Sequence, residues 1–208
     1  ARLNNVKRFV FASSGAPVGE VEPPIHEELA PHPVSPYGAS KLAGEGYCSS
    51  YSRTFGIDTV VLRFGNVYGP RSKNKASVVA KFIKQAIKGK VLEVYGKGDQ
   101  TRDFIYIKDL VYAIELAASK PGVGGEVFQI ATSAETTVNE IVDLLVSVLS
   151  EHGIKNIEVI HSETRLGDVE RNYSDTTKAN RMLGWDNRTE LIKGLKDTTK
   201  WFLSNLSR

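Results

Sequence analysis

Val6-Lys-Arg-Phe-Val-Phe-Ala12 is a short run of β-branched and aromatic residues that ends at Ser13-Ser14-Gly15. An apolar run closed by small turn-forming residues predicts a β-strand. After a stretch rich in proline, residues 37–54 show the spacing of a packed helix, and residues 58–64 form a second apolar run. Strand, helix and strand in this order predict an α/β fold with a largely parallel sheet.

The same alternation continues to the end of the chain. Thr137-Val-Asn-Glu140 is a capping box that marks the start of one of the later helices. The pattern predicts further strands at 91–95, 103–107, 127–131 and 157–160, and further helices at 78–88, 110–119, 137–150, 176–183 and 190–206. No composition break marks a second domain, so residues 1–208 are predicted to form one domain.

Composition narrows the class of protein. The chain has 208 residues, a net charge of +3 and a single cysteine, Cys48, which fits a reducing compartment. Its 27 basic residues are dispersed among 24 acidic ones, without the basic stripe of a nucleic-acid binder. No apolar run approaches the roughly 18 residues of a membrane span. We therefore expect a cytoplasmic protein with no nucleic-acid or membrane partner and no metal.

The Tyr37-x-x-x-Lys41 spacing places two chemically useful groups on one face of a helix. A lysine ammonium stabilises a tyrosinate, which lowers a phenol pKa from about 10 and makes the tyrosine a general base. Ser14 follows a strand, where ligands bind in open α/β sheets, and its hydroxyl can share a hydrogen bond with a reacting oxygen. Each motif alone also fits an ordinary packed helix or turn.

Three further segments carry groups that suit a diphosphate. Asn66 follows a strand between two glycines, Arg102 precedes an apolar run, and Arg165-Leu-Gly-Asp168 combines a cation with a carboxylate. Two arginines from distant segments can clamp phosphates, and a carboxylate can bind ribose hydroxyls. Taken singly, each of these segments fits a surface salt bridge equally well.

In order and spacing, the motifs together resemble the extended short-chain dehydrogenase/reductase family, in particular its nucleotide-sugar 4-epimerases. The segments on which this resemblance rests are Phe11-Ala-Ser-Ser14, Ser35-Pro-Tyr37-Gly-Ala-Ser-Lys41, Arg63-Phe-Gly-Asn66-Val-Tyr-Gly-Pro-Arg71, Gln100-Thr-Arg102-Asp-Phe and Arg165-x-Gly-Asp168. The resemblance covers nearly the whole chain. It implies the C-terminal part of a Rossmann-like doubly wound parallel sheet, with a small α/β substrate-binding lobe mainly at 66–105 and 133–208.

The resemblance also implies a function and a set of site residues. The function is NAD-dependent epimerisation at C4 of a UDP-sugar through a 4-keto intermediate, by a homodimer that includes helix 37–54 in its interface. The implied catalytic residues are Ser14, Tyr37 and Lys41, and the implied cofactor contacts are Ser13, Tyr37, Lys41 and Phe64. The implied substrate contacts are Ser14, Asn66, Arg102, Arg165, Asp168 and Asn172.

Within that family, the two residues that follow the catalytic serine or threonine differ between enzymes that catalyse different reactions. Dehydratases carry Asp-Glu directly after the catalytic serine or threonine, and decarboxylases keep a Glu, whereas this chain has Gly15-Ala16. The lack of a titratable group there favours simple epimerisation. Asn172 stands where galactose-type enzymes can carry a bulky tyrosine, which predicts tolerance of N-acetylated sugars. Pro17-Val18 replaces the family's Val-Tyr, which removes an aromatic ring and adds a rigid backbone beside Ser14.

No G-x-G-x-x-G segment follows a strand anywhere in the chain. The family carries that loop in an N-terminal half, so we expect these 208 residues to lack it, to bind NAD weakly and to be inactive alone. Three alternatives stay open: a nucleotide-sugar reductase or dehydrogenase, a non-catalytic fragment that binds a sugar nucleotide, and an α/β domain without a ligand.

Overall fold

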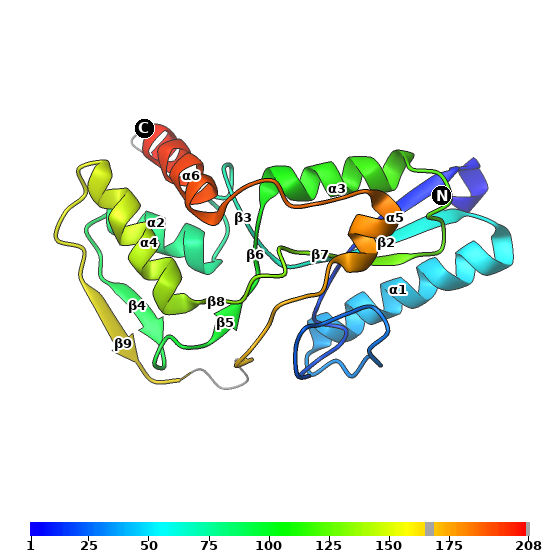
Figure 1. The fold of residues 1–208 in the computed structure, drawn as a ribbon, viewed down its shortest axis with the longest axis horizontal. Helices are drawn as coiled ribbons and strands as arrows, with labels where there is room; N and C mark the ends of the chain where they lie inside the picture. The colour runs from blue at the N-terminus through cyan, green and yellow to red at the C-terminus, as the bar shows by residue number, and fades with distance from the viewer. Residues whose placement is uncertain (165–168, 207–208) are drawn as a thin grey trace.

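The structure is a computed structural model that describes residues 1–164 and 169–206. Strands and helices alternate along the chain, as the sequence pattern predicts (Figure 1). The strands are β1 (Arg8–Ser14), β2 (Asp58–Phe64), β3 (Asn66–Tyr68), β4 (Leu92–Tyr95), β5 (Thr101–Arg102), β6 (Phe104–Tyr106), β7 (Val127–Ile130), β8 (Thr136–Thr137) and β9 (Val159–Ser162). The helices are η1 (Arg2–Asn4), α1 (Pro36–Phe55), α2 (Val78–Ile87), α3 (Ile107–Ser119), α4 (Val138–Glu151), α5 (Thr177–Leu183) and α6 (Leu191–Leu206).

The predicted parallel sheet is confirmed, with strand order β1-β2-β7. Strand β2 lies in the middle and is buried over most of its length, which accounts for its continuous apolar run. In the register of β1 and β2, Ser13 lies opposite Arg63 and Ser14 opposite Phe64. Helix α1 lies along this sheet, with α3 and α5 also in the same half of the molecule (Figure 1).

Local signals explain the limits of helix α1. The Ser35 hydroxyl caps its start by accepting a hydrogen bond from the Gly38 N–H at 3.0 Å, and Pro36 occupies the first turn. Gly56 ends the helix in the left-handed conformation that glycine adopts without strain. These residues fix Tyr37 in the first turn, next to the carboxyl end of β1.

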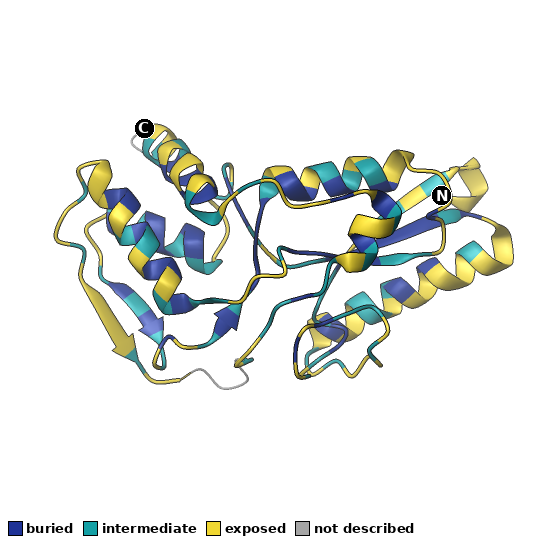
Figure 2. Ribbon diagram, in the orientation of Figure 1, coloured by how far each residue is buried: buried dark blue, intermediate teal, exposed yellow. Residues whose placement is uncertain are grey.

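A second half of the molecule contains α2, α4, α6 and the parallel pair β4-β9 (Figure 1). Its apolar side chains form one buried cluster, while those of the β1-β2-β7 sheet, α3 and α5 form another. The dark-blue buried residues follow the inward faces of these elements (Figure 2). The predicted capping box opens α4, with Thr137 and Glu140 bonded in both directions. Strand pairs β3-β6 and β5-β8 lie between the two halves.

Some element limits differ from those predicted. Helix α3 begins at Ile107 rather than at residue 110. The side chain of Ile107 continues the apolar run of the preceding strand, so the sequence pattern assigns it to that strand, whereas its backbone is helical. The predicted strand 103–107 is the shorter strand β6, and a separate strand, β5, precedes it, with the fully buried Asp103 between the two. Strand β9 is shifted by two residues from 157–160, because its pairing with β4 sets its limits.

Residues 15–35 form the predicted irregular segment between β1 and α1. One point of this segment is tied to a distant part of the chain: Ile25 donates to the Tyr173 carbonyl at 2.8 Å, and Asp175 donates back to the Ile25 carbonyl at 2.8 Å. Ile25 is buried at this contact. The long loop is therefore attached to the segment that follows the undescribed residues.

Candidate functional site

A cavity of about 800 Å³ lies at the carboxyl end of β1 and β2 and extends into the half that contains α2 and β4. This is the edge at which open α/β sheets bind ligands, and the volume suits a small organic molecule. Among the residues predicted to act in the site, Ser13, Ser14, Tyr37, Phe64, Asn66 and Arg102 line this one cavity. Residues more than sixty positions apart are thus brought together.

Tyr37, Lys41 and Ser14 form one end of the site. Tyr37 is 55% exposed, and the Lys41 ammonium lies 5.6 Å from the centre of its ring. Lys41 is fixed there because its Nζ donates to the Ala12 carbonyl of β1 at 2.9 Å. The Ser14 hydroxyl accepts a hydrogen bond from the Ala16 N–H at 3.2 Å, so its own proton is available to a ligand. The Tyr37 and Lys41 side chains lie on the same face of the helix, as the four-residue spacing predicts.

Ser13 is buried, and its hydroxyl donates to the Glu45 carboxylate at 2.5 Å. The hydroxyl proton is therefore used within the protein, which leaves the hydroxyl lone pairs and the backbone for any cofactor contact. Phe64 is half-buried and lines the same end of the cavity. Tyr37, Phe64 and the serines together offer hydroxyls and an aromatic face, and these groups suit a nicotinamide ring with its carboxamide.

The backbone at Gly65 and Asn66 is held on both sides. The Gly65 N–H donates to the Ile130 carbonyl at 3.0 Å, and the Asn66 N–H donates to the Asp103 carbonyl at 2.7 Å. A Cβ at position 65 would lie 3.0 Å from the Asp103 oxygen, so a side chain there would crowd this turn. Asn66 leaves the turn with an exposed side chain at the cavity wall.

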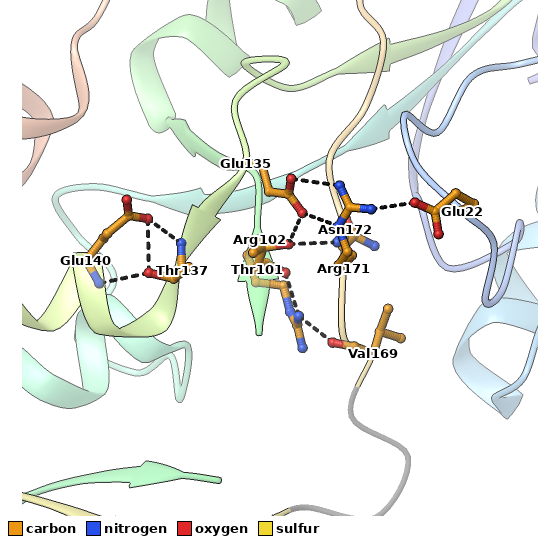
Figure 3. Close-up of polar contacts among 9 residues, drawn as sticks. All are labelled: Glu22, Thr101, Arg102, Glu135, Thr137, Glu140, Val169, Arg171 and Asn172. Atoms are coloured by element: carbon orange, nitrogen blue, oxygen red, sulfur yellow. Dashed lines mark hydrogen bonds and ion pairs between the residues drawn. The ribbon is translucent and has the colours of Figure 1, made fainter. Parts of the chain in front are cut away.

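Arg102 approaches the cavity from strand β5. Its Nη1 donates to the Thr101 carbonyl at 2.6 Å and to the Val169 carbonyl at 2.7 Å (Figure 3). These two contacts fix one edge of the guanidinium, and a planar guanidinium fork has the shape that suits a phosphate. The predicted residues Arg165 and Asp168 lie outside the described residues, close in sequence to Val169.

Asn172 is held near Arg102 by a cluster of polar contacts. Its N–H donates to the Thr101 hydroxyl at 3.3 Å, and that hydroxyl donates to Glu135 at 2.8 Å (Figure 3). Arg171 donates to Glu135 at 2.7 and 3.0 Å and also pairs with Glu22 of the long loop. The Arg171 hydrogen bond, with help from Thr101, lowers the pKa of Glu135. Asn172 is half-buried, and its side chain is not tied by these bonds.

The cavity also includes residues that the sequence motifs did not single out. Lys75, Ser77, Lys81 and Tyr95 line the half that lies away from Tyr37, together with Gln100 from the motif that contains Arg102. The Lys81 ammonium lies 4.8 Å from the centre of the Tyr95 ring, and Gln100 donates to the Tyr95 carbonyl at 2.9 Å. Lys75, Ser77 and Lys81 fall in the lysine-rich run 71–90, whose composition is typical of a solvated surface and does not mark them as site residues. One sequence signal was available for this segment: Ser77 directly precedes α2, and serine is a usual residue at the start of a helix.

Charge in the cavity favours an anionic ligand. Lys75, Lys81 and Arg102 contribute cationic groups, and Glu93 contributes an acidic one. Among residues 1–164 and 169–206, no three His, Cys, Asp or Glu side chains gather as metal ligands would. No helix in the same part of the chain is both long and apolar enough to cross a membrane.

A parallel α/β sheet with a neighbouring tyrosine and lysine, and with a cation-lined cavity at its carboxyl edge, is the arrangement expected of an enzyme that binds a nucleotide. Residues 1–131 match the family described as NAD dependent epimerase/dehydratase family. The chain belongs to this family, and its fold is the Rossmann-type fold of the family's epimerases.

Comparison with known proteins gives the same grouping. The UDP-glucose 4-epimerase of Mycolicibacterium smegmatis is 34% identical over 206 residues, which cover 97% of this chain and 64% of the relative. The crystal structure of UDP-glucose 4-epimerase from Thermotoga maritima with UDP-glucose has a TM-score of 0.90 and 38% identity, covering 97% of this chain and 65% of that one.

A third similar structure is UDP-glucuronic acid 4-epimerase from Bacillus cereus, solved with UDP-glucuronic acid and NAD. Its TM-score is 0.85 and its identity 30%, over 95% of this chain and 62% of that one. The present chain thus spans about two thirds of the length of the proteins that it matches. NAD is the cofactor of the family and is bound in several of its solved structures.

Proposed function

We propose that this protein epimerises C4 of a UDP-sugar, with NAD as cofactor. The observation that supports this most is that Ser14 and Tyr37 lie at one end of a cavity whose wall also includes Asn66 and Arg102. A sugar at the first pair and a diphosphate at the second would fill it in one orientation. Similar proteins named as UDP-glucose and UDP-glucuronate 4-epimerases support the same substrate class.

In this proposal the residues at the sheet edge handle a proton. Tyr37 Oη accepts the proton of the sugar 4-hydroxyl as general base, and the nearby Lys41 ammonium stabilises the phenolate. The Ser14 hydroxyl donates to the sugar oxygen and orients it. NAD, when bound, supplies reversible hydride transfer. The 4-keto sugar then turns over within the cavity, and Tyr37 returns the proton to the product oxygen.

The residues beside Ser14 support epimerisation rather than elimination. Position 15 is a glycine with open space around its backbone, and position 16 is an alanine. Neither residue can supply the acid or base that the loss of water from the sugar would require. Reduction or net oxidation would consume cofactor, whereas epimerisation recycles it.

The test is conversion of UDP-glucose by the natural polypeptide that contains residues 1–208, in parallel with the 208-residue chain alone. With catalytic NAD, we expect UDP-galactose to form in the natural polypeptide up to a constant ratio, without accumulation of NADH. NADH formed in proportion to product would instead show a dehydrogenase. Uridine nucleotide binding without conversion in either form would support a non-catalytic protein.

We further propose that the protein accepts N-acetylated sugars, and this proposal rests on Asn172. Its side chain leaves more room than a tyrosine would, and the bonds that hold the residue use its backbone N–H. UDP-N-acetylglucosamine is therefore expected to be a substrate. Turnover at well under a hundredth of the UDP-glucose rate would contradict this proposal.

We also propose that the protein is a homodimer that uses helix α1. Tyr47, Tyr51 and Phe55 recur every four residues on this helix and are 69%, 40% and 42% exposed. A stripe of exposed aromatic residues is costly in water, and a second copy of the helix would cover it. Light scattering of the natural polypeptide should give the mass of two chains, and Tyr47→Lys should give the mass of one.

The last two parts of the proposal concern the bounds of the substrate-binding lobe and the cellular compartment of the protein. We propose that the substrate-binding lobe comprises 66–105 and 133–208, while the remaining residues hold the catalytic pair. Cys48 is free and buried, which agrees with residence in a reducing compartment such as the cytoplasm. Limited proteolysis with and without UDP should protect sites in the two lobe segments if the division is right.

A further inference from the structure

Helix α1 carries the proposed catalytic pair but has few apolar anchors. Its buried residues are Gly38, Glu45 and Cys48. Gly44 packs so closely on the Phe11 ring that a Cβ there would lie 2.3 Å from the ring edge. A close glycine contact sets how near the helix lies to the strand, but it does little to stop the helix from sliding along it. Directional polar contacts must therefore fix the position along the axis.

Glu45 provides such contacts from the buried face of α1. Its Oε1 accepts from the Ser13 hydroxyl at 2.5 Å and from Arg63 Nε at 3.0 Å, while its Oε2 accepts from Arg63 Nη2 at 2.7 Å. The side chains of Arg63 and Glu45 are only 5% and 7% exposed. Ser13 and Arg63 lie opposite each other on β1 and β2, so Glu45 is bonded to both strands at one level of the sheet.

Three consecutive residues of β1 contact helix α1 or line the cavity. Ala12 of β1 accepts from Lys41, the next residue Ser13 donates to Glu45, and the next, Ser14, faces the cavity. On the helix, Tyr37, Lys41 and Glu45 are spaced by four residues and share one face. Glu45 lies roughly 12 Å from Tyr37 along the axis at about 1.5 Å per residue. Its bond to Ser13 thus sets the level of Tyr37 relative to Ser14.

We propose that Glu45 is a positioning residue for the epimerase reaction, which acts by accepting the Ser13 hydrogen bond and so holds Tyr37 and Lys41 level with Ser14. This inference rests on the proposed function, because it assigns Tyr37 and Ser14 to the reacting sugar. A buried ion pair is by itself weak evidence for stability, since apolar residues of similar size often replace it without loss. That fact allows a test in which the fold is kept and the Ser13 contact is removed.

The experiment compares two double variants of the natural polypeptide that contains residues 1–208. Glu45→Met with Arg63→Met removes both charges and the acceptor for Ser13. Glu45→Gln with Arg63→Met removes both charges but keeps a side-chain carbonyl for Ser13. The matched control is Thr59→Val, which deletes another buried helix-to-strand hydrogen bond, from the Thr59 hydroxyl to the Cys48 carbonyl at 2.9 Å, on the half of α1 away from the cavity.

For the methionine pair, we expect kcat to fall about 10- to 100-fold, as misplacement by about 1 Å does in other enzymes. Its KM for UDP-glucose should stay within about twofold, because substrate binding is not changed. The glutamine pair should recover most of kcat, and the Thr59 control should match the wild type. A structural role alone would make the methionine pair and the control alike.

A second measurement does not depend on turnover. The ring signal of ¹³C-labelled Tyr37, assigned with Tyr37→Phe, should shift in the methionine pair and stay unchanged in the glutamine pair and in Thr59→Val. An unchanged Tyr37 signal and wild-type kcat in the methionine pair would overturn the positioning role. If the wild type has no activity on any UDP-sugar but the Tyr37 signal still shifts in the methionine pair, the proposed function is overturned. The role of Glu45 in positioning Tyr37 is then still supported.

Discussion

Replacing Asp103 by asparagine tests how the cavity wall is held. The Asp103 carboxylate is fully buried and accepts four hydrogen bonds. One oxygen accepts from the Thr132 N–H at 2.7 Å and from the Thr132 hydroxyl at 2.6 Å, and the other accepts from the N–H groups of Ser133 at 3.0 Å and Ser174 at 3.3 Å. The side chain thus joins β5 and β6 to the loop after β7 and to the segment that contains Asn172.

The magnitude follows from the groups left without an acceptor. The asparagine carbonyl can keep both Thr132 contacts, but its NH₂ group would face the Ser133 and Ser174 N–H groups. A buried donor without a partner costs about 1–3 kcal/mol. Ser174 is buried and bears this cost in full, whereas Ser133 is exposed and can turn to water. With the weaker bonds to a neutral acceptor added, the loss in unfolding free energy is about 2–4 kcal/mol.

The assay is urea and thermal unfolding of the wild type, Asp103→Asn and the exposed-helix control Asp143→Asn. For a chain of this size, the expected loss corresponds to a fall in Tm of roughly 4–16 °C. Asp143 is exposed on α4, so its variant should unfold with the wild type. A loss below about 0.5 kcal/mol in Asp103→Asn, the size of ordinary surface changes, would refute this reading of the hydrogen bonds.

Three other predictions concern the site. Tyr37→Phe should lower kcat by about 10²- to 10⁴-fold, the range for loss of a general base, while Tyr47→Phe on the same helix should not; equal losses in steady-state assays would contradict the role of Tyr37. Arg102→Met should raise KM for UDP-glucose about 10- to 100-fold with little change in kcat, because a charge-assisted phosphate contact is lost; an unchanged KM would remove Arg102 from the substrate site. Because the Arg171 hydrogen bond lowers the pKa of Glu135 below its ordinary 4.5, the contact stabilises the fold above that pH and is lost as the pH falls through the lowered pKa. Unfolding measured between pH 3 and 7 should show a smaller loss of stability at acid pH in Glu135→Gln than in the wild type, and identical curves would contradict it.

Much of the fold follows from local patterns in the chain. Helix α1 could be predicted because Ser35, Pro36 and Gly56 mark its ends, and α4 because Thr137 and Glu140 form a capping box. The limits of β9 could not be predicted, since they depend on its register with β4. Long-range pairing sets strand limits that neighbouring residues in the sequence do not encode.

The candidate site was partly accessible from sequence. The motifs indicated Ser14, Tyr37, Asn66 and Arg102, and the structure brings all of these to one cavity. Their roles stay predictions, as do those of Arg165 and Asp168, which lie outside the described residues. The burial of Glu45 could not be foreseen, because a glutamate on a helix is almost always solvated and its partner Arg63 lies on strand β2, distant in the sequence.

The central claim is that a C4 hydride leaves the sugar and returns to it while Tyr37 handles the hydroxyl proton. The most direct measurement uses UDP-glucose deuterated at C4, with catalytic NAD and the natural polypeptide that contains residues 1–208, followed by mass spectrometry and ¹H NMR of the product. The account predicts UDP-galactose that keeps deuterium at C4, and no conversion by Tyr37→Phe on the same time scale. UDP-galactose with solvent hydrogen at C4, or equal conversion by Tyr37→Phe, would contradict it.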